Sequence, residues 1–253
     1  VADAFVPAAV LGLPVVDADP VGRAVPELQD SMFFVHGVKL TPQVVVNEIG
    51  DTVVITSVAD GLRAEALVRA LAVASRNLVW VVDHAGTWDA IRPVVFCGAI
   101  SGAERMGAAV RKARAAGDDV ASVIAATGGG HVLFRGVIAA NEWSDHGGFT
   151  HGEMRLEGRD VDRGEVFRIW YRNENLGASR DDTPRVTAPD LIVVIGSDGM
   201  PVTNPFGRVG DAAGVVGLPA PAGWRTPRGI EVFGPRALGF GVDYVPLEDA
   251  GRA

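Results

Sequence analysis

The sequence is poor in lysine and cysteine, and each shortage excludes a class of protein. Lys39 and Lys112 are its only lysines, and the formal net charge is −8 at pH 7. A nucleic-acid-binding surface needs clustered basic side chains, so we exclude nucleic acid as a partner. Cys97 is the only cysteine. The absence of an internal disulfide is typical of a reducing compartment, and we expect a cytoplasmic protein.

Long apolar runs are also missing. Pro, Gly or a charged residue interrupts each run well before membrane-spanning length, so we expect no membrane segment. The chain begins with Val1, and no basic leader precedes an apolar core. We therefore expect a fragment, a processed chain or a separately encoded subunit, whose partner is a companion chain or a further copy in a homo-oligomer.

The first half of the chain contains clear helix and hairpin signals. Residues 43–56 alternate like a hairpin around a Gly-Asp turn. Residues 60–76 carry apolar side chains at helical spacing, and Asp60 stands where an N-cap is expected. Ser101 and Glu104 have the spacing of a capping box, which predicts a second helix from Ser101.

The second half has a different texture. After about residue 130, short strand-like segments alternate with Gly, Asn, Asp and Pro, and residues 229–234 are among these predicted strands. Residues 177–189 are predicted to form a flexible loop. We predict an α+β fold, with an α/β portion over residues 1–127 that is incomplete at its N-terminus and a mostly β domain over residues 128–253.

Residues 15–29 are the most informative stretch, because acids and an arginine follow an apolar segment that resembles a buried strand. Asp17 and Asp19 alternate with apolar residues, so both carboxylates project from one face of an extended chain. Arg23 and Glu27 follow at a turn. We predict a catalytic cluster in which a carboxylate activates water and Arg23 stabilises negative charge. Helix capping and pairing with an arginine are the structural alternatives.

Several motifs occur together in one order along the chain. They are VVDADPVGRAVPELQ at 15–29, GGF at 147–149, NENLGA at 173–178 followed by PDLI at 189–192, and GPRALGFGVDYVPL at 234–247. This combination resembles the S-methyl thiohydantoin desulfurase family over about residues 5–247. The resemblance implies an α/β part, a β-rich carboxyl-terminal part, and a five-membered cyclic ureide or thioureide as substrate.

The same resemblance draws attention to a polar cluster after a predicted strand. Asn173, Glu174 and Asn175 offer amide and carboxyl groups that match the alternating C=O and N–H groups of a hydantoin ring. We predict that they bind the substrate together with Arg236. A β-turn held by Asn side chains, and a buried structural pair of Asp190 and Arg236, are the alternatives.

These observations predict a hydrolase-like enzyme that acts on a small cyclic amide or thioamide, by desulfuration or by ring hydrolysis. The alternative is a non-catalytic subunit that binds and stabilises a hydantoinase- or oxoprolinase-type partner. Either role is compatible with the residues quoted above.

Cofactor requirements are not determined by the sequence. The five histidines form no closely spaced pair, so the metal site is unknown and a divalent metal stays possible without being predicted. For each histidine, a hydrogen bond to a loop carbonyl is the favoured interpretation, although His84 follows Asp83 at a strand end. Cys97 is expected to be a small buried apolar residue.

Overall fold

The computed structural model describes residues 2–250, so Val1, on which the expectation about the chain's start rests, lies outside the described residues. The first part contains α1 (Phe5–Leu11), β1 (Ala18–Asp19), α2 (Met32–Val35), β2 (Gln43–Val46), β3 (Thr52–Ile55), α3 (Gly61–Ala74), β4 (Trp80–Val82), α4 (Trp88–Ile91), β5 (Phe96–Cys97), α5 (Ala99–Ala116) and α6 (Val120–Gly128). The second part contains β6 (His131–His146), β7 (Phe149–Gly158), β8 (Val166–Arg172), β9 (Glu174–Arg180), β10 (Thr183–Thr187), β11 (Leu191–Gly196), β12 (Ala212–Leu218) and α7 (Pro227–Phe233).

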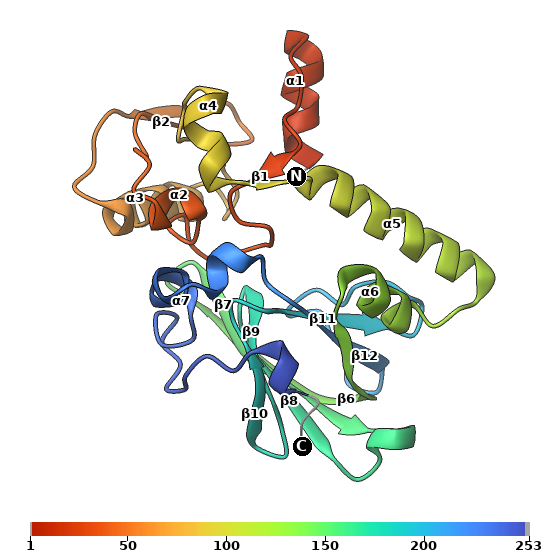
Figure 1. Ribbon diagram of the computed structural model, residues 1–253. Helices are drawn as coiled ribbons and strands as arrows, with labels where there is room; N and C mark the ends of the chain where they lie inside the picture. Colours follow the sequence, from red (N-terminus) through yellow and green to blue (C-terminus); the bar gives the residue numbers. More distant parts are fainter. Residues whose placement is uncertain (1, 251–253) are drawn as a thin grey trace.

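The predicted α+β class is confirmed. Figure 1 shows helices and small strands in the first part, and a curled seven-stranded antiparallel sheet in the second, in the order β10-β9-β8-β7-β6-β12-β11. The edge strand β11 also contacts β9, which brings the two sides of the sheet together. Helix α6 packs against β12 and covers part of the sheet.

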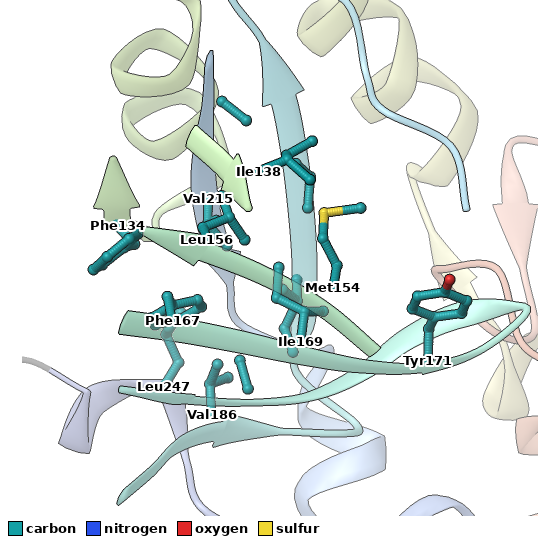
Figure 2. Close-up of a cluster of buried hydrophobic side chains, with 14 residues drawn as sticks. Phe134, Ile138, Met154, Leu156, Phe167, Ile169, Tyr171, Val186, Val215 and Leu247 are labelled. Carbon is teal, nitrogen blue, oxygen red and sulfur yellow. The ribbon is translucent and has the colours of Figure 1, made fainter. Parts of the chain in front are cut away.

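The main core fills the inside of the curled sheet (Figure 2). In β8, Phe167, Ile169 and Tyr171 are buried while the residues between them are half-buried, which is the period of two expected for a strand with one covered face. The neighbouring strand β7 adds Met154 and Leu156 from the same face. This large core places the ends of β7, β8 and β9 in defined positions.

Two local predictions for the first part are confirmed. Strands β2 and β3 form the expected hairpin, with Gln43 opposite Ile55, and β4 pairs with the other edge of β2. Helix α3 begins after Asp60, whose Oδ1 accepts a hydrogen bond of 2.8 Å from the backbone N–H of Arg63. Both signals are local, so they survive in the tertiary structure.

The predicted capping box of the next helix is wrong. Helix α5 begins at Ala99, so Ser101 lies inside its first turn. The cap comes from a distant residue: Asp17 Oδ1 accepts hydrogen bonds from the backbone N–H groups of Ile100, at 2.8 Å, and Ser101, at 3.1 Å. Hydrogen bonds from Ser101 and Ile100, with the nearby charge of Arg105, lower the pKa of Asp17.

Three further expectations differ from the structure. The apolar segment before Asp17 is not a buried strand, because β1 is two residues long, pairs only with β5, and leaves Val16 exposed. The predicted loop at 177–189 is the β9–β10 hairpin. The predicted strand at 229–234 lies largely in α7, where Thr226 caps the helix and a proline occupies its first turn.

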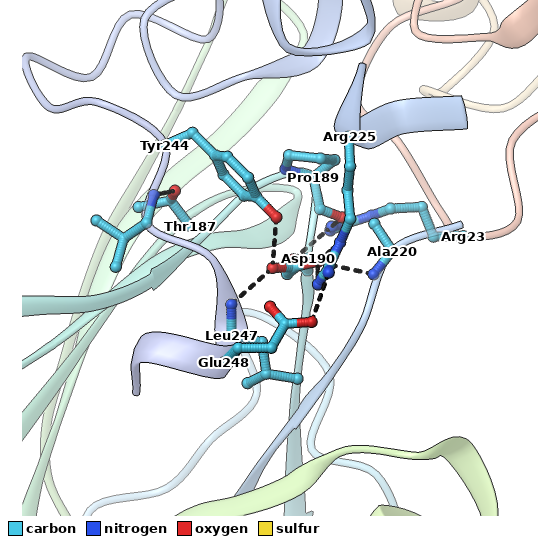
Figure 3. Close-up of polar contacts among 10 residues, drawn as sticks. Arg23, Thr187, Pro189, Asp190, Ala220, Arg225, Tyr244, Leu247 and Glu248 are labelled. Carbon is cyan, nitrogen blue, oxygen red and sulfur yellow. Dashed lines mark hydrogen bonds and ion pairs between the residues drawn. The ribbon is translucent and has the colours of Figure 1, made fainter. Parts of the chain in front are cut away.

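A buried carboxylate joins the sheet to the C-terminal tail (Figure 3). Asp190 is 0% exposed. Its Oδ1 accepts hydrogen bonds of 2.7 Å from the backbone N–H of Ala220 and from Arg225, and its Oδ2 accepts bonds of 2.9 Å from the Tyr244 hydroxyl and the Leu247 backbone. Burial and this carboxylate raise the pKa of Tyr244. We call this group the Asp190 hub.

We expect Asp190→Ala to lower the free energy of unfolding by about 3–5 kcal/mol, because it leaves a hydroxyl and two backbone N–H groups without an acceptor and removes the buried partner of Arg225, which keeps only the exposed Glu248. Urea unfolding followed by circular dichroism measures this change. Asp243→Ala is the matched control, because Asp243 forms an exposed ion pair with Arg236 and its loss should not change stability measurably. Equal effects of the two substitutions would contradict the importance of the hub.

Candidate functional site

Two cavities meet at Glu27 and Asp30. The α3 cavity, of about 410 Å³, lies between the segment before α2, helix α3 and the end of β4. The α7 cavity, of about 310 Å³, continues from the same two carboxyl groups towards Arg172 and helix α7. Residues from both parts of the chain therefore line two adjoining cavities that share these carboxyl groups.

Asp30 is the most unusual group in this site. It is 2% exposed, and its Oδ2 has no hydrogen-bond partner among the described residues. Burial, with the negative charge of Glu27 as a further cause, raises the pKa of Asp30 to about 8. The next residue, Ser31, caps α2 by accepting a bond of 3.2 Å from the Phe34 backbone, which holds this part of the chain in place. Asp30 therefore carries a proton at neutral pH.

Other polar atoms around Asp30 also lack partners. They are Gln29 Oε1 and Arg172 Nε, both buried. Buried polar atoms in native proteins are normally hydrogen-bonded, and a bound molecule or water can supply the missing partner. Gln29 and Arg172 both line the α7 cavity. An acceptor, a protonated carboxyl and a donor are thus available to a polar ligand.

Glu27 is held by a cation and an aromatic support. Its carboxylate lies 2.5 Å from the Arg172 guanidinium and also accepts a hydrogen bond from Gln29. The Arg172 guanidinium lies 5.1 Å from the ring centre of Phe149, and Arg69 lies over the same ring at 4.2 Å. Phe149 belongs to the GGF segment at the β6–β7 turn, so this motif positions two cations of the site.

Helix α3 supplies a second charged pair. Glu65 is buried and accepts a bond of 2.9 Å from the Leu28 backbone, and Arg69 donates to Glu65 at 2.7 Å. Arg69 also donates to the Pro26 carbonyl at 2.7 Å. These bonds fasten the segment that carries Glu27 to helix α3.

His84 lines the α3 cavity from the end of β4. Its Nδ1 lies 2.9 Å from Asp83 Oδ1, and its ring stacks on Phe33 at 4.6 Å. The histidine is 7% exposed. A carboxylate is therefore its partner, in place of the loop carbonyl favoured from sequence.

Three predicted catalytic residues have structural partners and line neither cavity. Asp17 caps α5, as described above. Asp19 Oδ1 accepts bonds from the backbone N–H groups of Val21, at 2.5 Å, and Gly22, at 2.6 Å. Arg23 donates to the carbonyls of Pro189 and Asp190, both at 2.8 Å. Burial lowers the pKa of Arg23 to about 10. Of the predicted cluster, the structure brings only Glu27 to the site.

The predicted substrate-binding residues are divided in the same way. Asn173 lines the α3 cavity and accepts a bond of 2.9 Å from the Thr150 backbone. Glu174 is half-buried, and burial raises its pKa. Asn175 donates to the Ile192 carbonyl of β11 at 3.0 Å, a contact between strands and not the β-turn considered as the structural alternative. Arg236 lines neither cavity. Its side chain is 68% exposed and pairs with Asp243 at 2.6 Å.

Sequence reasoning missed Asp30 and Arg172. Asp30 is the residue directly after the quoted stretch, and the Ser31 N-cap was its only local signal.

Cys97 is exposed, contrary to the expected burial. Within residues 2–250, no group of three or more His, Cys, Asp or Glu side chains is placed to bind a metal ion. In the same range, no helix combines the length and apolar character needed to cross a membrane.

Comparisons with known proteins agree with this architecture. The chain matches the family model described as S-Me-THD-like, N-terminal domain, over residues 1–57, and the one described as S-Me-THD-like, C-terminal domain, over residues 59–247. A crystal structure of a protein from Chromobacterium violaceum shares the fold, with a TM-score of 0.74 and 24% identity, over 95% of this chain and 68% of that chain. A search of curated proteins found no match.

The raised pKa of Asp30 predicts a pH dependence of stability. Between the ordinary value of 3.8 and about 8, the folded protein keeps the proton that the unfolded chain has released. The free energy of unfolding should therefore fall across this window, with a contribution of about 1.4 kcal/mol per pH unit from this group. Urea unfolding from pH 4 to pH 8 should show that slope in the wild type but not in Asp30→Asn. Asp89→Asn, at an exposed position on α4, should retain it. Equal slopes in all three proteins would contradict a protonated Asp30.

Proposed function

Because the chain belongs to the S-methyl thiohydantoin desulfurase family, we propose that it removes sulfur from an S-methyl thiohydantoin-type ring by hydrolysis. Water adds to the ring carbon that carries the S-methyl group, the C–S bond breaks, and methanethiol leaves. The ring keeps a carbonyl at that carbon. This reaction needs an acid, a base and groups that hold the polar edge of the ring.

The observation that supports this proposal is the protonated Asp30 at the junction of two cavities. A carboxyl group that keeps its proton at neutral pH can donate it to a ring nitrogen as water adds to the neighbouring carbon. Among the described residues its Oδ2 has no partner, so a ligand can supply one. The ordinary interpretation of a buried acid, a structural ion pair, does not apply, because no described cation contacts Asp30.

The surrounding polar atoms suit the edge of a cyclic ureide or thioureide. Gln29 Oε1 can accept from a ring N–H, and Arg172 Nε can donate to a ring carbonyl. Asn173 lies on the α3 side of the same two carboxyl groups and remains a proposed substrate contact. Matching each ring group with a buried partner rejects analogues that lack it, which supplies specificity.

We expect Asp30→Asn to lower kcat for methanethiol release by at least about 100-fold at pH 7, because Asn has no carboxyl proton to give. A colorimetric thiol assay with an S-methyl thiohydantoin measures the rate. Parallel tests with hydantoin and with a five-membered lactam identify the preferred ring. Asp89→Asn controls for a generic loss of charge. If the wild-type chain turned over none of these rings, the proposed function would be rejected.

A second candidate function is that of a subunit in a larger assembly. Helix α1 and the turn after it expose the apolar side chains of Phe5, Val6, Val10, Leu11, Leu13 and Val16, which are 46–79% exposed. Figure 1 shows α1 extending away from the rest of the chain. Exposed apolar side chains gathered on one segment suit a protein contact. We propose it as the contact for a hydantoinase- or oxoprolinase-type companion or for a second copy, in the cytoplasm, where a single free thiol is stable.

Size-exclusion chromatography with mass analysis tests this second candidate. The native preparation should elute above the monomer mass of 26.4 kDa, and the double substitution Val10→Glu/Leu11→Glu should convert it to a folded monomer by placing charge in the contact. Val161→Glu, at another exposed apolar position, is the control and should leave the assembly intact. A wild-type protein that is monomeric and fully active would rule out an obligate partner.

A further inference from the structure

The proposed reaction needs a base for the attacking water, and the acids at the junction of the cavities do not provide one. Asp30 is protonated at neutral pH. Glu27 is already engaged by Arg172 and Gln29. We propose that His84, oriented by Asp83, accepts the water proton. This inference rests on the proposed function and adds a catalytic pair to it.

The contact between the two residues leaves the other ring nitrogen free. His84 Nδ1 lies 2.9 Å from Asp83 Oδ1, so Nε2 is the nitrogen that does not face the carboxylate. Among the described residues, Nε2 has no hydrogen-bond partner and is not one of the buried unpartnered atoms. It is therefore reachable by water. A carboxylate that fixes one ring nitrogen while the other faces a cavity is the arrangement of an oriented general base.

The position of His84 in the fold supports the same role. Strand β4 ends at Val82, which pairs with Val44 of β2, and Asp83 follows directly. His84 has a φ of 47°, in the left-handed region that a side chain other than Gly seldom adopts. Stacking on Phe33 fixes its ring. Strained backbone of this kind persists where the surrounding structure holds a functional side chain.

The ionisable groups around His84 come from several elements. Those that line the α3 cavity are Glu27, Asp30, Glu65, Arg69 and Asp83. His84 also lines a neighbouring cavity of about 390 Å³, whose ionisable groups are Lys39, Asp60 and Arg228. Of these groups, Asp83 lies against the ring of His84 directly.

The proton movements balance without a further reactant. The water oxygen bonds to the ring carbon, one water proton passes to His84 Nε2, and the C=N electron pair moves to the ring nitrogen, which takes the proton of Asp30. As the carbonyl forms, its hydroxyl proton returns to Asp30, and the C–S bond breaks with its electron pair on sulfur. The imidazolium proton then passes to sulfur, so one water is consumed, one methanethiol leaves and both residues regain their starting state.

The pH profile of methanethiol release tests this inference in the full chain. We expect His84→Gln to lower kcat by about 10²–10⁴-fold, with KM changed less than about threefold, because the base acts on water and not on ring binding. The acidic limb of the wild-type profile, where the imidazole becomes protonated, should disappear, and the alkaline limb set by Asp30 should remain. Imidazole added to His84→Ala should restore part of the rate.

Two further variants keep the test decisive. Asp83→Asn should lower kcat and move the acidic limb even if the His84 variants fold poorly, because it removes the carboxylate that lies against an intact histidine. His131→Gln, at an exposed position at the start of β6, should leave rate and profile unchanged. If the wild type is active and His84→Gln keeps both its rate and its acidic limb, the His84 assignment is overturned and the proposed function stands. If the wild type releases no methanethiol, both are overturned.

Discussion

The buried Asp190 carboxylate is the interaction on which the arrangement of the chain depends. It accepts hydrogen bonds from Ala220, Arg225, Tyr244 and Leu247. These residues lie in separate segments of loop and C-terminal tail, which the carboxylate joins. A charge without such donors is costly in an apolar interior, so these segments stay together. Arg23 donates to the backbone carbonyl of Asp190, and this bond holds the segment before α2 against the sheet.

That segment delivers two carboxyl groups with different environments to the candidate site. Glu27 lies against Arg172, whereas no cation among the described residues contacts Asp30, and its burial, together with the charge of Glu27, raises its pKa. Neighbouring carboxyl groups in different environments are a frequent basis of acid–base chemistry. The difference between the two environments is a product of packing, in which the GGF turn takes part through Phe149 and the two cations over its ring.

Local signals predicted much of the fold, and their failures have physical causes. The β2–β3 hairpin and α3 follow from residue period, turn chemistry and the Asp60 cap, all within a few residues. Residues 229–234 contain apolar residues that suit either a strand or a short helix, and the Thr-Pro start of α7 decides between them. The polar segment at 177–189 is a hairpin because the sheet supplies pairing partners and a core that the sequence window does not contain. The division of the chain near residue 127 stays a prediction.

The sequence by itself determined the α+β class, the resemblance to the family and the stretch of chain in which the candidate site lies, because residue period, composition and ordered motifs are properties of neighbouring residues. Only the tertiary structure decided which polar side chains share a cavity. Asp17 is bound to the start of α5, whereas Asp30 and His84 line one space from different elements. A side chain's partners and burial depend on contacts between residues distant in the chain, and those contacts give an acid a capping role in one place and a proton at neutral pH in another.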